Sequence, residues 1–583
     1  MRGPSFNFFK VNLDTRAKTR TLAYDISLIT IMAVLAACGL IYQYLLSHYA
    51  GRVLGMMEHA IFTMIGVMIV SMGLGAFLAK TVSCAFTGFA WLEAIIAFFG
   101  GTGILVIGGM FAFSFLFPEI IGNNFGMPAD LVPIGGFVQT IQQIAGITPY
   151  IIGFIIGLFI GMEIPFIARV REHIYGEHLA HNVGTIYGAD YVGAGIGAAI
   201  FIIFMLNQPP EETAVYTAAV NLLAGLAFFF MFRKRIRWST TLLTGHALLG
   251  VMLLVLYANA ANWNQSFEDA LYKDKVIYSL DTKFQHITLT KRMISPEYGP
   301  VYALYLNGRT QFNSSDERIY HDMLVHPVLL ASARKKKILI IGGGDGLALR
   351  EVLKWNPDSV TLLELDSEMV RLFSEPVMAD GKQVNKALLS LNKASFSDSR
   401  VDVIYGDAFN SVDALIGKNQ RYDAIIVDLP DPSHPNLNKL YTTSYYNKLY
   451  HLLAGDGAIV IQSTSPYHAK AAFLTVGVSL KASGFKHVSR FHQNVPSFGE
   501  WGWTIATVNG LSPEERIAAM PGDMPEDTWA SKELILGSFH FGKDFFVSEA
   551  DIKPNRLGTQ TMYQLHQQAW MQEQGLAERK TDN

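Results

Sequence analysis

The chain lacks the residues that crosslinked or metal-scaffolded proteins depend on. Cys38 and Cys84 are the only cysteines among 583 residues, and both lie in or beside apolar segments. They supply neither a disulfide framework nor the ligand spacing of a metal site. Charge is also scarce: 16% of residues are charged, the formal net charge is -3, and no basic stripe is interleaved with aromatics. The composition therefore argues against nucleic-acid binding.

Long apolar runs are abundant in the first half of the chain. A helix needs roughly 20 apolar residues to cross the hydrocarbon core of a bilayer. Seven runs meet this length, and the first is too long and too late to be a simple signal peptide. The sequence predicts a multi-span α-helical membrane domain over residues 1–260. The predicted spans are Ile26–Leu46, Ile61–Leu78, Trp91–Phe115, Thr148–Ile167, Val183–Leu206, Thr213–Phe232 and Thr240–Ala258.

The basic residues beside these runs give an orientation that is difficult to reconcile with seven crossings. The positive-inside rule places the N-terminus in the cytoplasm. Seven full crossings would then leave the second half of the chain outside. Either the last segment does not cross, or the charge rule does not hold here, or the second half is external. The basic residues are Arg16, Lys18 and Arg20 before the first run, Arg169 and Arg171 after the fourth, and Arg233, Lys234, Arg235 and Arg237 after the sixth.

Four ionisable residues lie inside the predicted spans: Glu93, Glu163, Asp190 and His246. Such residues are functional candidates by default. The competing interpretation is structural, because a buried carboxylate must be paired or protonated wherever it sits. The structural interpretation is favoured.

The second half of the chain has the pattern of a soluble α/β protein. Residues 275–306 alternate like a β-meander and end at Asn307-Gly308, which is a hairpin-turn signal. From Lys337 onward, strand and helix patterns alternate, which predicts a parallel sheet with helices on both faces. Ligands of such folds bind outside the carboxyl ends of the strands. The expected strands are 338–341, 360–365, 401–405, 424–428 and 458–463.

Three polar features follow consecutive predicted strands. The turn from Gly342 through Gly344 to Gly346 lets backbone approach a ligand closely. Glu364 ends the next strand, where an acid can hold both hydroxyls of a ribose. Asp407 follows a third strand, where it could accept from an adenine amine. Each feature alone could be an ordinary turn, but in series they indicate a nucleoside site.

Two carboxylates in Asp428-Leu429-Pro430-Asp431-Pro432 indicate an amine substrate. The prolines hold this segment extended and rigid. An amine nucleophile must lose a proton before it attacks; one acid can take that proton while the other holds a second ammonium. The alternative is a proline-rich turn with solvated aspartates.

Residues 275–507 resemble the spermidine synthase family, the polyamine aminopropyltransferases. The whole chain resembles the membrane-embedded bacterial branch, in which several spans precede the enzyme domain. The motifs that carry the resemblance are Phe284-Gln285-His286-Ile287, Leu306-Asn307-Gly308-Arg309-Thr310-Gln311, Tyr320-His321-Asp322-Met323, Gly342-Gly343-Gly344-Asp345-Gly346, Glu364-Leu365-Asp366, Gly406-Asp407-Ala408 and Asp428 to Pro432.

The resemblance implies a Rossmann-like, methyltransferase-type domain beside a small N-terminal β-domain, and it implies roles for individual residues. Asp345 would pair with the amine of the aminopropyl arm of decarboxylated S-adenosylmethionine, and Asp428 would be the proton acceptor. A carboxylate at Asp345 would also repel the carboxylate of intact S-adenosylmethionine. The methylthioadenosine part would contact Gln285, Glu364, Asp407, Ala408 and Pro435, together with the backbone of Gly342 and Gly344. The amine channel would contain Tyr320, His321, Gln311, Asp428, Asp431 and Trp501.

The resemblance further implies no metal, because the sulfonium supplies its own leaving group, and a homo-oligomer. Departures from the family pattern fall on the acceptor side. Leu429-Pro430 follow the first aspartate, and Val495 stands where a channel tyrosine is usual. Glu500 is extra and either contacts a cation or caps a loop. Donor binding is therefore better supported than putrescine as the amine.

The domain prediction is a membrane domain at 1–260, a small β-domain at 261–310, a catalytic domain at 311–510 and an extension at 511–583 without assigned chemistry. The leading hypothesis is a membrane-bound aminopropyltransferase of the bacterial inner membrane that makes spermidine from putrescine. A cytoplasmic catalytic domain is expected because adenosyl cofactors are made there. The alternatives are a methyltransferase or lyase using intact S-adenosylmethionine, and a polyamine transporter or sensor whose soluble domain only binds ligand.

Overall fold

The computed structural model divides into two compact units, Met1–Asp274 and Lys275–Asn583, and each is treated by itself. The predicted boundary at residue 260 is wrong, because the helix that contains it continues to Tyr272. The structure describes residues 15–54, 57–124, 136–175, 182–205, 208–272, 274–295, 297, 299–379, 381–521 and 524–573.

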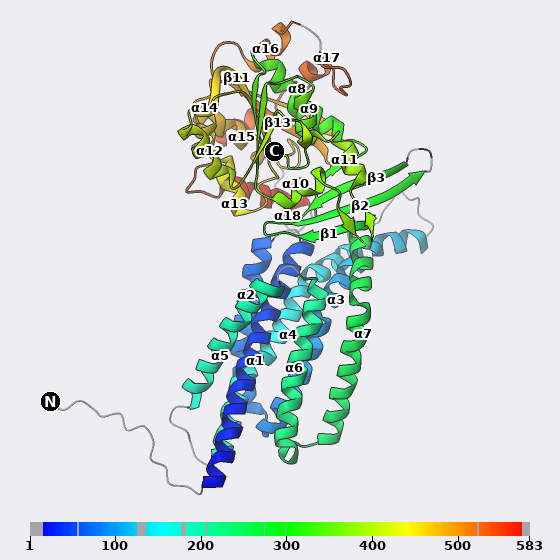
Figure 1. Ribbon diagram of the computed structural model, residues 1–583, viewed down its shortest axis with the longest axis vertical. Coiled ribbons are helices and arrows are strands. Elements are labelled where there is room, and N and C mark those ends of the chain that lie inside the picture. Colours follow the sequence, from blue (N-terminus) through cyan, green and yellow to red (C-terminus); the bar gives the residue numbers. More distant parts are fainter. Residues whose placement is uncertain are drawn as a thin grey trace, which may run out of the picture. The chain divides into compact units, whose positions relative to one another are not determined.

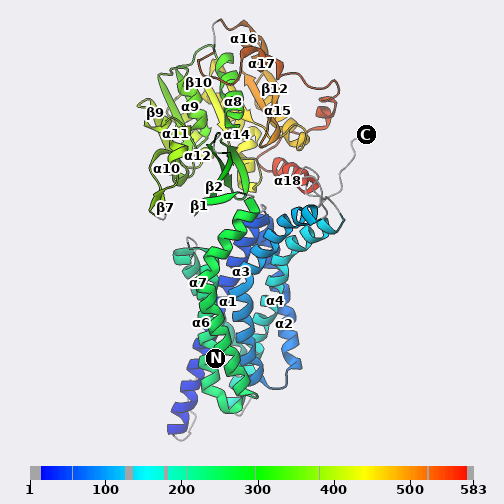
Figure 2. The ribbon, with the colours of Figure 1, turned by 90° about the vertical axis from the view of Figure 1, so that its right-hand side faces the viewer.

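The first unit, the helical unit, is a bundle of long apolar helices (Figure 1, Figure 2). Seven helices in the described part are long and apolar enough to cross a membrane, and each predicted span falls on one of them. The predicted fifth span ends at Leu206, which lies outside the described residues. The helices are α1 (Thr15–Leu54), α2 (Met57–Leu78), α3 (Ala85–Asn124), α4 (Gly136–Tyr175), α5 (Asn182–Ile200), α6 (Pro210–Phe232) and α7 (Ser239–Tyr272), with short turns η1 (Ala79–Thr81), η2 (Phe201–Met205) and η3 (Arg233–Arg235).

Small residues let these helices pack closely. A Cβ on Gly193 of α5 would overlap the carbonyl oxygen of Ala33 in α1, and one on Gly161 of α4 would overlap that of Met72 in α2. Only glycine permits such approach, which is the usual packing device of helices in lipid.

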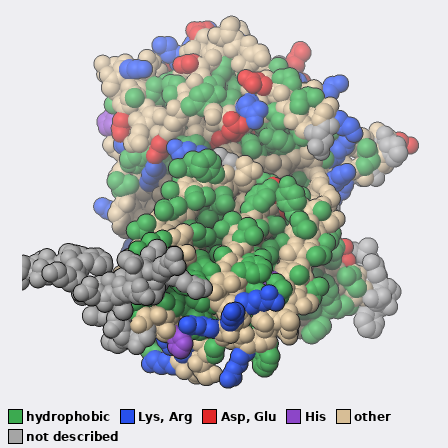
Figure 3. All heavy atoms as spheres, turned by 60° about the horizontal axis from the view of Figure 1, so that its bottom comes forward, with side chains coloured by type: hydrophobic (Ala, Val, Ile, Leu, Met, Phe, Trp, Pro, Cys, Tyr) green, Lys and Arg blue, Asp and Glu red, His purple; other side chains and the backbone are tan. Residues whose placement is uncertain are grey.

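The outer surface of the helical unit is apolar. Phe62, Tyr191 and Leu254 are 69%, 71% and 70% exposed. Figure 3 shows hydrophobic side chains spread over this unit and Lys and Arg side chains gathered near its tip. A continuous apolar surface of this kind needs a partner other than water.

The second unit, which we name the catalytic unit after the activity that the sequence predicts for it, begins with an antiparallel sheet in the order β1-β2-β3-β4. Its strands are β1 (Lys275–Asp281), β2 (His286–Ser295), β3 (Gly299–Leu306) and β4 (Arg309–Asn313). The predicted meander is confirmed, although it runs to residue 313. Asn307 and Gly308 connect β3 to β4 with φ of 51° and 78°. Positive φ at both positions is what a two-residue hairpin turn requires, and Asn-Gly tolerates it best.

A seven-stranded sheet in the order β12-β13-β11-β10-β5-β6-β9 forms the core of the same unit. Strands from β11 to β9 are parallel, as predicted, while β12 and β13 form an antiparallel edge that the prediction did not contain. The run of buried residues in β5 is apolar throughout because both faces of this sheet are covered. The strands are β5 (Lys337–Gly342), β6 (Ser359–Glu364), β9 (Val401–Tyr405), β10 (Tyr422–Asp428), β11 (Leu453–Gln462), β12 (His487–Val495) and β13 (Gly499–Thr507), with a separate pair β7 (Met378–Ala379) and β8 (Lys382–Gln383).

Helices cover both faces of this sheet (Figure 1). The longer ones are α8 (Glu317–Ala331), α10 (Ser367–Ser374), α12 (Ala408–Gly417), α14 (Thr443–Leu452), α15 (Lys470–Ala482) and α18 (Thr561–Glu573). The shorter ones are α9 (Leu347–Leu353), α11 (Lys386–Leu391), α13 (Pro435–Asn438), α16 (Pro513–Ala519) and α17 (Lys532–Gly537), with turns η4 (Ser395–Ser397), η5 (Lys439–Tyr441) and η6 (Val547–Asp551).

The parallel register brings the predicted polar residues to one edge of the sheet. Asp428 of β10 pairs with Gly342 of β5, and Glu364 of β6 pairs with Tyr405 of β9. The carboxyl ends of these strands are therefore level with one another, which is where ligands of this fold class bind.

Candidate active site

The glycine turn after β5 lies between two acids. A Cβ on Gly343 would lie 3.1 Å from Asp428 Oδ2, and one on Gly344 would lie 2.7 Å from Glu364 Oε2. Gly342, Gly343 and Gly346 all have positive φ, of 82°, 70° and 72°. Side chains here would both strain the backbone and fill the space beside the acids. The turn thus leaves its backbone open to a ligand, with one carboxylate on either side.

Glu364 is held in position by the backbone that follows it. Its Oε1 accepts from the N–H groups of Leu365 at 2.7 Å and Asp366 at 3.0 Å. The Oε2 atom is the one that faces Gly344. Burial raises the pKa of Glu364 to about 7. A carboxyl group with one oxygen fixed and the other facing the glycine turn can accept hydrogen bonds from sugar hydroxyls.

The remaining predicted donor-side residues already have protein partners. The Gln285 side-chain amide donates to Asp366 at 3.0 Å, which ties the β1–β2 turn to the start of α10. Asp407 caps α12 by accepting from the Phe409 N–H at 3.0 Å, and it forms an ion pair with Lys439. The other two predicted residues, Ala408 and Pro435, are the first residues of α12 and α13.

Asp428 ends β10 and is partly buried. The Tyr320 hydroxyl donates to its Oδ1 at 2.7 Å, while Oδ2 faces Gly343. Burial raises the pKa of Asp428 to about 6; the charge of His321 and the Tyr320 hydrogen bond oppose this rise, and the charge of Asp345 adds to it. A carboxyl group that titrates near neutrality is suited to accept a proton from an amine.

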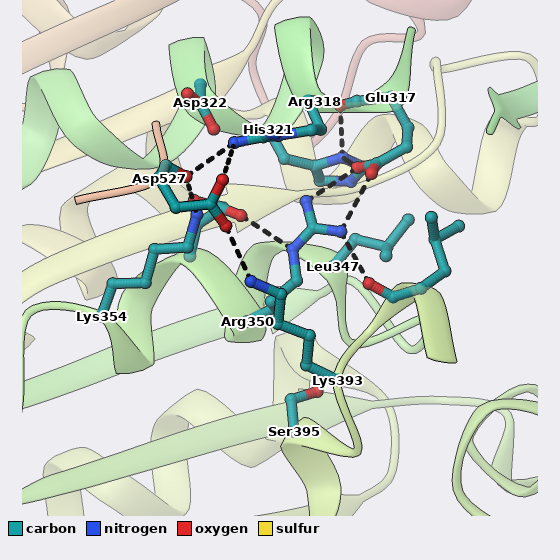
Figure 4. Close-up of polar contacts among 12 residues, drawn as sticks. Glu317, Arg318, His321, Asp322, Leu347, Arg350, Lys354, Lys393, Ser395 and Asp527 are labelled. Carbon is teal, nitrogen blue, oxygen red and sulfur yellow. Dashed lines mark hydrogen bonds and ion pairs between the residues drawn. The ribbon is translucent and has the colours of Figure 1, made fainter. Parts of the chain in front are cut away.

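Tyr320 and His321 both belong to α8, and His321 is fixed by a buried ion-pair network (Figure 4). His321 Nδ1 donates to the carbonyl oxygen of Glu317 at 2.7 Å and to its Oε2 at 2.9 Å. Arg350 of α9 binds the Glu317 carboxylate through two nitrogens, at 2.9 and 3.0 Å. Burial on its own would lower the pKa of His321, but Glu317 outweighs it and raises this pKa to about 9. The site therefore holds a positive charge beside Asp428 at neutral pH.

Asp345 lies in the same electrostatic neighbourhood. It is buried, and its Oδ1 accepts from the Leu347 N–H at 2.9 Å at the start of α9. Burial raises the pKa of Asp345, and the charge of His321 opposes the rise. Tyr320, His321, Asp345 and Asp428 thus come together as predicted at one end of the sheet.

Asp431 differs from Asp428 in being surrounded by donors. Its Oδ1 accepts from the Gln462 side-chain amide at 2.8 Å. Its Oδ2 accepts from Thr464 at 3.4 Å and from Nε2 of His566 at 3.1 Å. His566 belongs to residues 511–583, to which the sequence analysis assigned no chemistry, and the fold brings it into contact with Asp431. The sequence offered no motif there beyond a histidine on an amphipathic helix.

The other predicted amine-side residues lie around this group. Gln311 is the extra residue of a bulge in β4, because Leu304 and Tyr305 pair with Phe312 and Thr310. Bulges re-aim side chains and are common beside active sites. The rings of Trp501 and Phe498 lie 5.1 Å apart, and Phe498 contacts Tyr320 at 5.9 Å. Glu500, the departure noted above, forms an ion pair with His492.

One further cluster contains atoms of the kind that bind metals. Ligand atoms of Asp322, His326 and Glu351 all lie within 4.8 Å of one another, and all three residues are buried. Lys354 Nζ lies 2.6 Å from Glu351 Oε2, and the Trp355 indole donates to His326 Nδ1 at 3.0 Å. His326 of α8 lies 3.2 Å from Glu351 of α9, so the cluster joins the two helices.

The fold and the site define a class: a Rossmann-like domain whose strand ends carry acids on both sides of a glycine turn. Residues 317–515 match the spermine/spermidine synthase domain. A polyamine aminopropyltransferase of Shewanella oneidensis is 52% identical over 552 residues, covering 95% of this chain and 96% of the relative. Polyamine aminopropyltransferase 1 of Streptomyces coelicolor is 31% identical over 541 residues, covering 92% and 93%. The chain belongs to the polyamine aminopropyltransferase family and is an enzyme of that kind.

A solved structure described as spermidine synthase in complex with the transition-state analogue AdoDATO is 24% identical, with a TM-score of 0.40. That similarity covers 48% of this chain and 89% of the solved one.

Proposed function

We propose that this enzyme transfers the aminopropyl group of decarboxylated S-adenosylmethionine to putrescine, forming spermidine and methylthioadenosine, from a catalytic unit tethered to a bilayer. The placement of Asp428 beside the open glycine turn carries this proposal. On the other side of the turn, Glu364 is available for the nucleoside.

The proposed chemistry requires few steps. An acceptor ammonium gives a proton to Asp428, and its nitrogen lone pair then attacks the aminopropyl carbon attached to sulfur. The carbon–sulfur bond breaks, and its electron pair leaves with sulfur as a neutral thioether. Asp345 holds the amine of the aminopropyl arm, and the backbone of the glycine turn positions the donor. Alignment of nitrogen, carbon and sulfur supplies most of the rate enhancement.

Product analysis tests the reaction. Purified full-length protein is offered decarboxylated S-adenosylmethionine with a panel of amines that includes putrescine and membrane lipids, and the products are identified by mass spectrometry. Spermidine and methylthioadenosine are expected. Offering intact S-adenosylmethionine in a parallel reaction tests the methyltransferase or lyase alternative, and methylated or cleaved products there would replace the proposal.

The helical unit is proposed to span the bilayer as seven helices. Their lengths and the exposed apolar side chains support this. We further propose a cytoplasmic catalytic unit, since the donor is made in the cytoplasm. With seven crossings, that placement requires the basic end of the helical unit, including Arg233 to Arg235, to face the outside of the cell. This is the opposite of what the positive-inside rule predicts. A protease added to intact spheroplasts tests this orientation. Cleavage of the catalytic unit by the external protease would show that the unit lies outside the cell.

Polyamine movement through the helical unit is a second candidate function, favoured by buried polar atoms in the bundle. Within the described residues, Glu93 Oε1, Glu163 Oε2 and His246 Nε2 have no hydrogen-bond partner. Uptake of labelled spermidine into vesicles that contain the protein tests this function, with Glu163→Gln and Asp190→Asn as variants. Uptake that both variants abolish would support it, and uptake no greater than in empty vesicles would exclude it.

A further inference from the structure

One end of the helical unit contains a pocket of about 570 Å³. The segment between η1 and α3, the last turns of α4, and η3 form its walls. Pockets that hold small ligands have volumes of about 300–1,000 Å³. Among the described residues that line this pocket none is acidic, so its charge is that of an anion site. The lining includes Ser83, Cys84, Phe86, Arg169, His173 and Arg235.

Two arginines of this pocket have no acid to neutralise them. The Arg169 Nη1 and Nη2 atoms donate to the carbonyl oxygens of Val82 at 2.8 Å and Ala79 at 3.1 Å. Within the described residues, Arg169 Nε has no hydrogen-bond partner, and neither Arg169 nor Arg235 pairs with a carboxylate. Both guanidinium charges are therefore left for solvent or for a ligand.

The neighbouring Arg171 shows how this unit neutralises an arginine. Its guanidinium binds both oxygens of Asp25, at 2.5 and 3.0 Å, and donates to Asn182 Oδ1 at 2.8 Å. A buried charge is costly without such partners, and Arg171 is 5% exposed. Arg169 lies two residues earlier on α4, lines the pocket and has no such acid. An anion supplied from outside the chain would serve Arg169 as Asp25 serves Arg171.

Phe86 holds the other two basic side chains beside the pocket. The Arg235 guanidinium carbon lies 5.2 Å from the centre of the Phe86 ring, and the His173 ring meets the same ring edge-on at 5.4 Å. Phe86 is buried, so it is a fixed support for both side chains. A cation–π contact orients a guanidinium group without using its N–H groups. Those of Arg235 therefore remain available to phosphate oxygens, which arginine binds through paired hydrogen bonds.

Apolar and aromatic side chains flank the pocket in the sequence. Phe77, in the last turn of α2, is 69% exposed, and Trp238, three residues after Arg235, is 74% exposed. Exposed apolar side chains of this unit face lipid in the proposed membrane placement, and tryptophan is enriched at the level of the headgroups. Basic pockets between membrane helices at that level bind anionic headgroups. These flanking residues favour the phosphate of a lipid over one that is dissolved in water.

We propose that this pocket binds the phosphate group of an anionic phospholipid, with Arg169, His173 and Arg235 as the donors. The pocket includes the start of α3, the end of α4 and the turn between α6 and α7. One bound headgroup therefore links these helices at their ends. The inference rests on the proposed placement of the helical unit in a bilayer and not on the transfer reaction.

Cys84 supplies a natural reporter inside the pocket. Its Sγ accepts a hydrogen bond from the Thr87 hydroxyl at 3.4 Å. Burial on its own would raise the pKa of the Cys84 thiol, but hydrogen bonds from Thr87 and Phe86 and the charge of Arg237 outweigh it and lower the pKa. The other cysteine, Cys38, is 2% exposed. A thiol reagent should therefore label Cys84 in preference to Cys38.

Labelling of Cys84 by a neutral maleimide tests the proposal in nanodiscs, which expose both ends of the helical unit. Full-length protein is compared in phosphatidylcholine alone and in equal parts of phosphatidylcholine and phosphatidylglycerol. Phosphatidylglycerol should slow labelling roughly fivefold or more, because a bound headgroup covers the thiol and its charge raises the thiol pKa. Arg235→Gln should lose most of this slowing. Lys234→Gln is the matched control, since it removes the same charge from a residue that does not line the pocket, and it should keep the slowing.

The outcomes separate a lipid site from general surface charge. Equal slowing in wild type and both variants would reduce the effect to the charge of the bilayer, and no slowing in wild type would mean that no lipid phosphate enters the pocket; both overturn the proposal. A parallel reaction in detergent uses inorganic phosphate without lipid. Protection there equal to that by phosphatidylglycerol would overturn the lipid assignment in favour of dissolved phosphate.

Folding controls keep the test decisive. The thermal midpoint of Arg235→Gln in phosphatidylcholine should match wild type, because the Arg235 side chain is exposed. His173→Gln leaves both arginines in place and should lose part of the slowing, so it provides the same comparison if Arg235→Gln lowers the midpoint. Full slowing in a correctly folded His173→Gln would remove His173 from the site. Failure of the protein to enter nanodiscs would instead contradict the proposed bilayer placement.

Discussion

Acids are buried in both units, but they are partnered in different ways. In the catalytic unit, Glu317 is bound by Arg350 and His321, and Asp431 by three side chains. In the helical unit, Glu93 accepts from Asn221 at 2.9 Å through one oxygen, while its other oxygen and Glu163 Oε2 have no partner within the described residues. A buried carboxylate without partners is costly when ionised, so it must be neutral or bound to a cation. The number of hydrogen-bond and ion-pair partners therefore separates the buried acids that work as anions from those that the fold tolerates as neutral groups.

The largest effect is expected at Asp428, the catalytic-unit acid that we propose as the proton acceptor. Asp428→Asn should lower kcat by roughly 100- to 10,000-fold, because the amide cannot accept the proton of the ammonium. Binding of methylthioadenosine, measured by calorimetry, should stay within threefold. Asp428 also costs stability as an anion: a pKa rise from 3.8 to about 6 corresponds to roughly 3 kcal/mol lost above pH 6. The variant should therefore be at least as stable as wild type at pH 8, whereas joint loss of binding and stability would make Asp428 a folding residue.

The second largest effect is expected where a well-partnered acid is removed. Glu317→Ala leaves the buried Arg350 and His321 without their carboxylate, and breaking a buried pair in this way typically costs roughly 3–5 kcal/mol. Faster hydrogen exchange of amides in α8 and α9 should report this loss. Glu317→Gln is the milder control, since it keeps oxygen and size. Unchanged exchange in the Ala variant would show that the network contributes little.

The pH profile is expected to change by an intermediate amount. Transfer needs Asp428 ionised, so kcat/KM should fall as the pH drops below about 6. Tyr320→Phe removes a hydrogen bond that stabilises the anion, so the pKa of Asp428 rises and the acid limb should move up by roughly one pH unit. His321, with a pKa of about 9, contributes stability that is fully present below its usual value of 6.5 and is lost as the pH rises through 9. An acid limb that stays in place in the Tyr320 variant would remove Asp428 as the titrating group.

Much of the catalytic unit was predictable because local signals there coincide with the tertiary contacts. Buried parallel strands give apolar runs, and the glycine turn and the acids follow them directly, so the positions of Gly342, Glu364 and Asp428 at strand ends could be predicted. The antiparallel pair β12 and β13 was missed because its polar and aromatic residues give no clear period. His566 was missed because its partner is 135 residues away and only the tertiary fold brings Asp431 to it.

The helical unit was predictable for a different reason. Span length depends on hydrocarbon thickness alone, so seven runs could be counted without knowing how they pack. The extent of α7 was misjudged because its last turns, through Phe267 and Tyr272, are amphipathic and do not differ in composition from a linker. Which polar atoms of the bundle find partners depends on helix rotation, and periodicity does not determine rotation.

A small effect is expected at Glu163, whose Oε2 has no hydrogen-bond partner among the residues that the structure describes. Glu163→Gln replaces a buried carboxyl group with a neutral group of nearly the same shape, so stability should change by less than roughly 1 kcal/mol. Turnover measured in nanodiscs should stay within twofold of wild type, in contrast to Glu317→Ala. A tenfold loss of turnover would mean that the Glu163 side chain is an ionised and bound group, and the contrast between the two units would then fail.

The smallest effect is expected at an acid that has partners but is exposed. The Asp527 carboxylate pairs with Arg318 and Lys393, and the Asp527 backbone carbonyl accepts from Lys354, yet the Asp527 side chain is 58% exposed (Figure 4). Exposed pairs contribute little, because water and salt screen them. Asp527→Asn isolates the charge, since asparagine also tolerates the positive φ of 61° at this position. The thermal midpoint should fall slightly at low salt and match wild type at high salt. A large fall in the thermal midpoint that persists at high salt would show that ion-pair partners stabilise an exposed acid as well as a buried one. Burial would then not be needed to explain the difference between the acids of the two units.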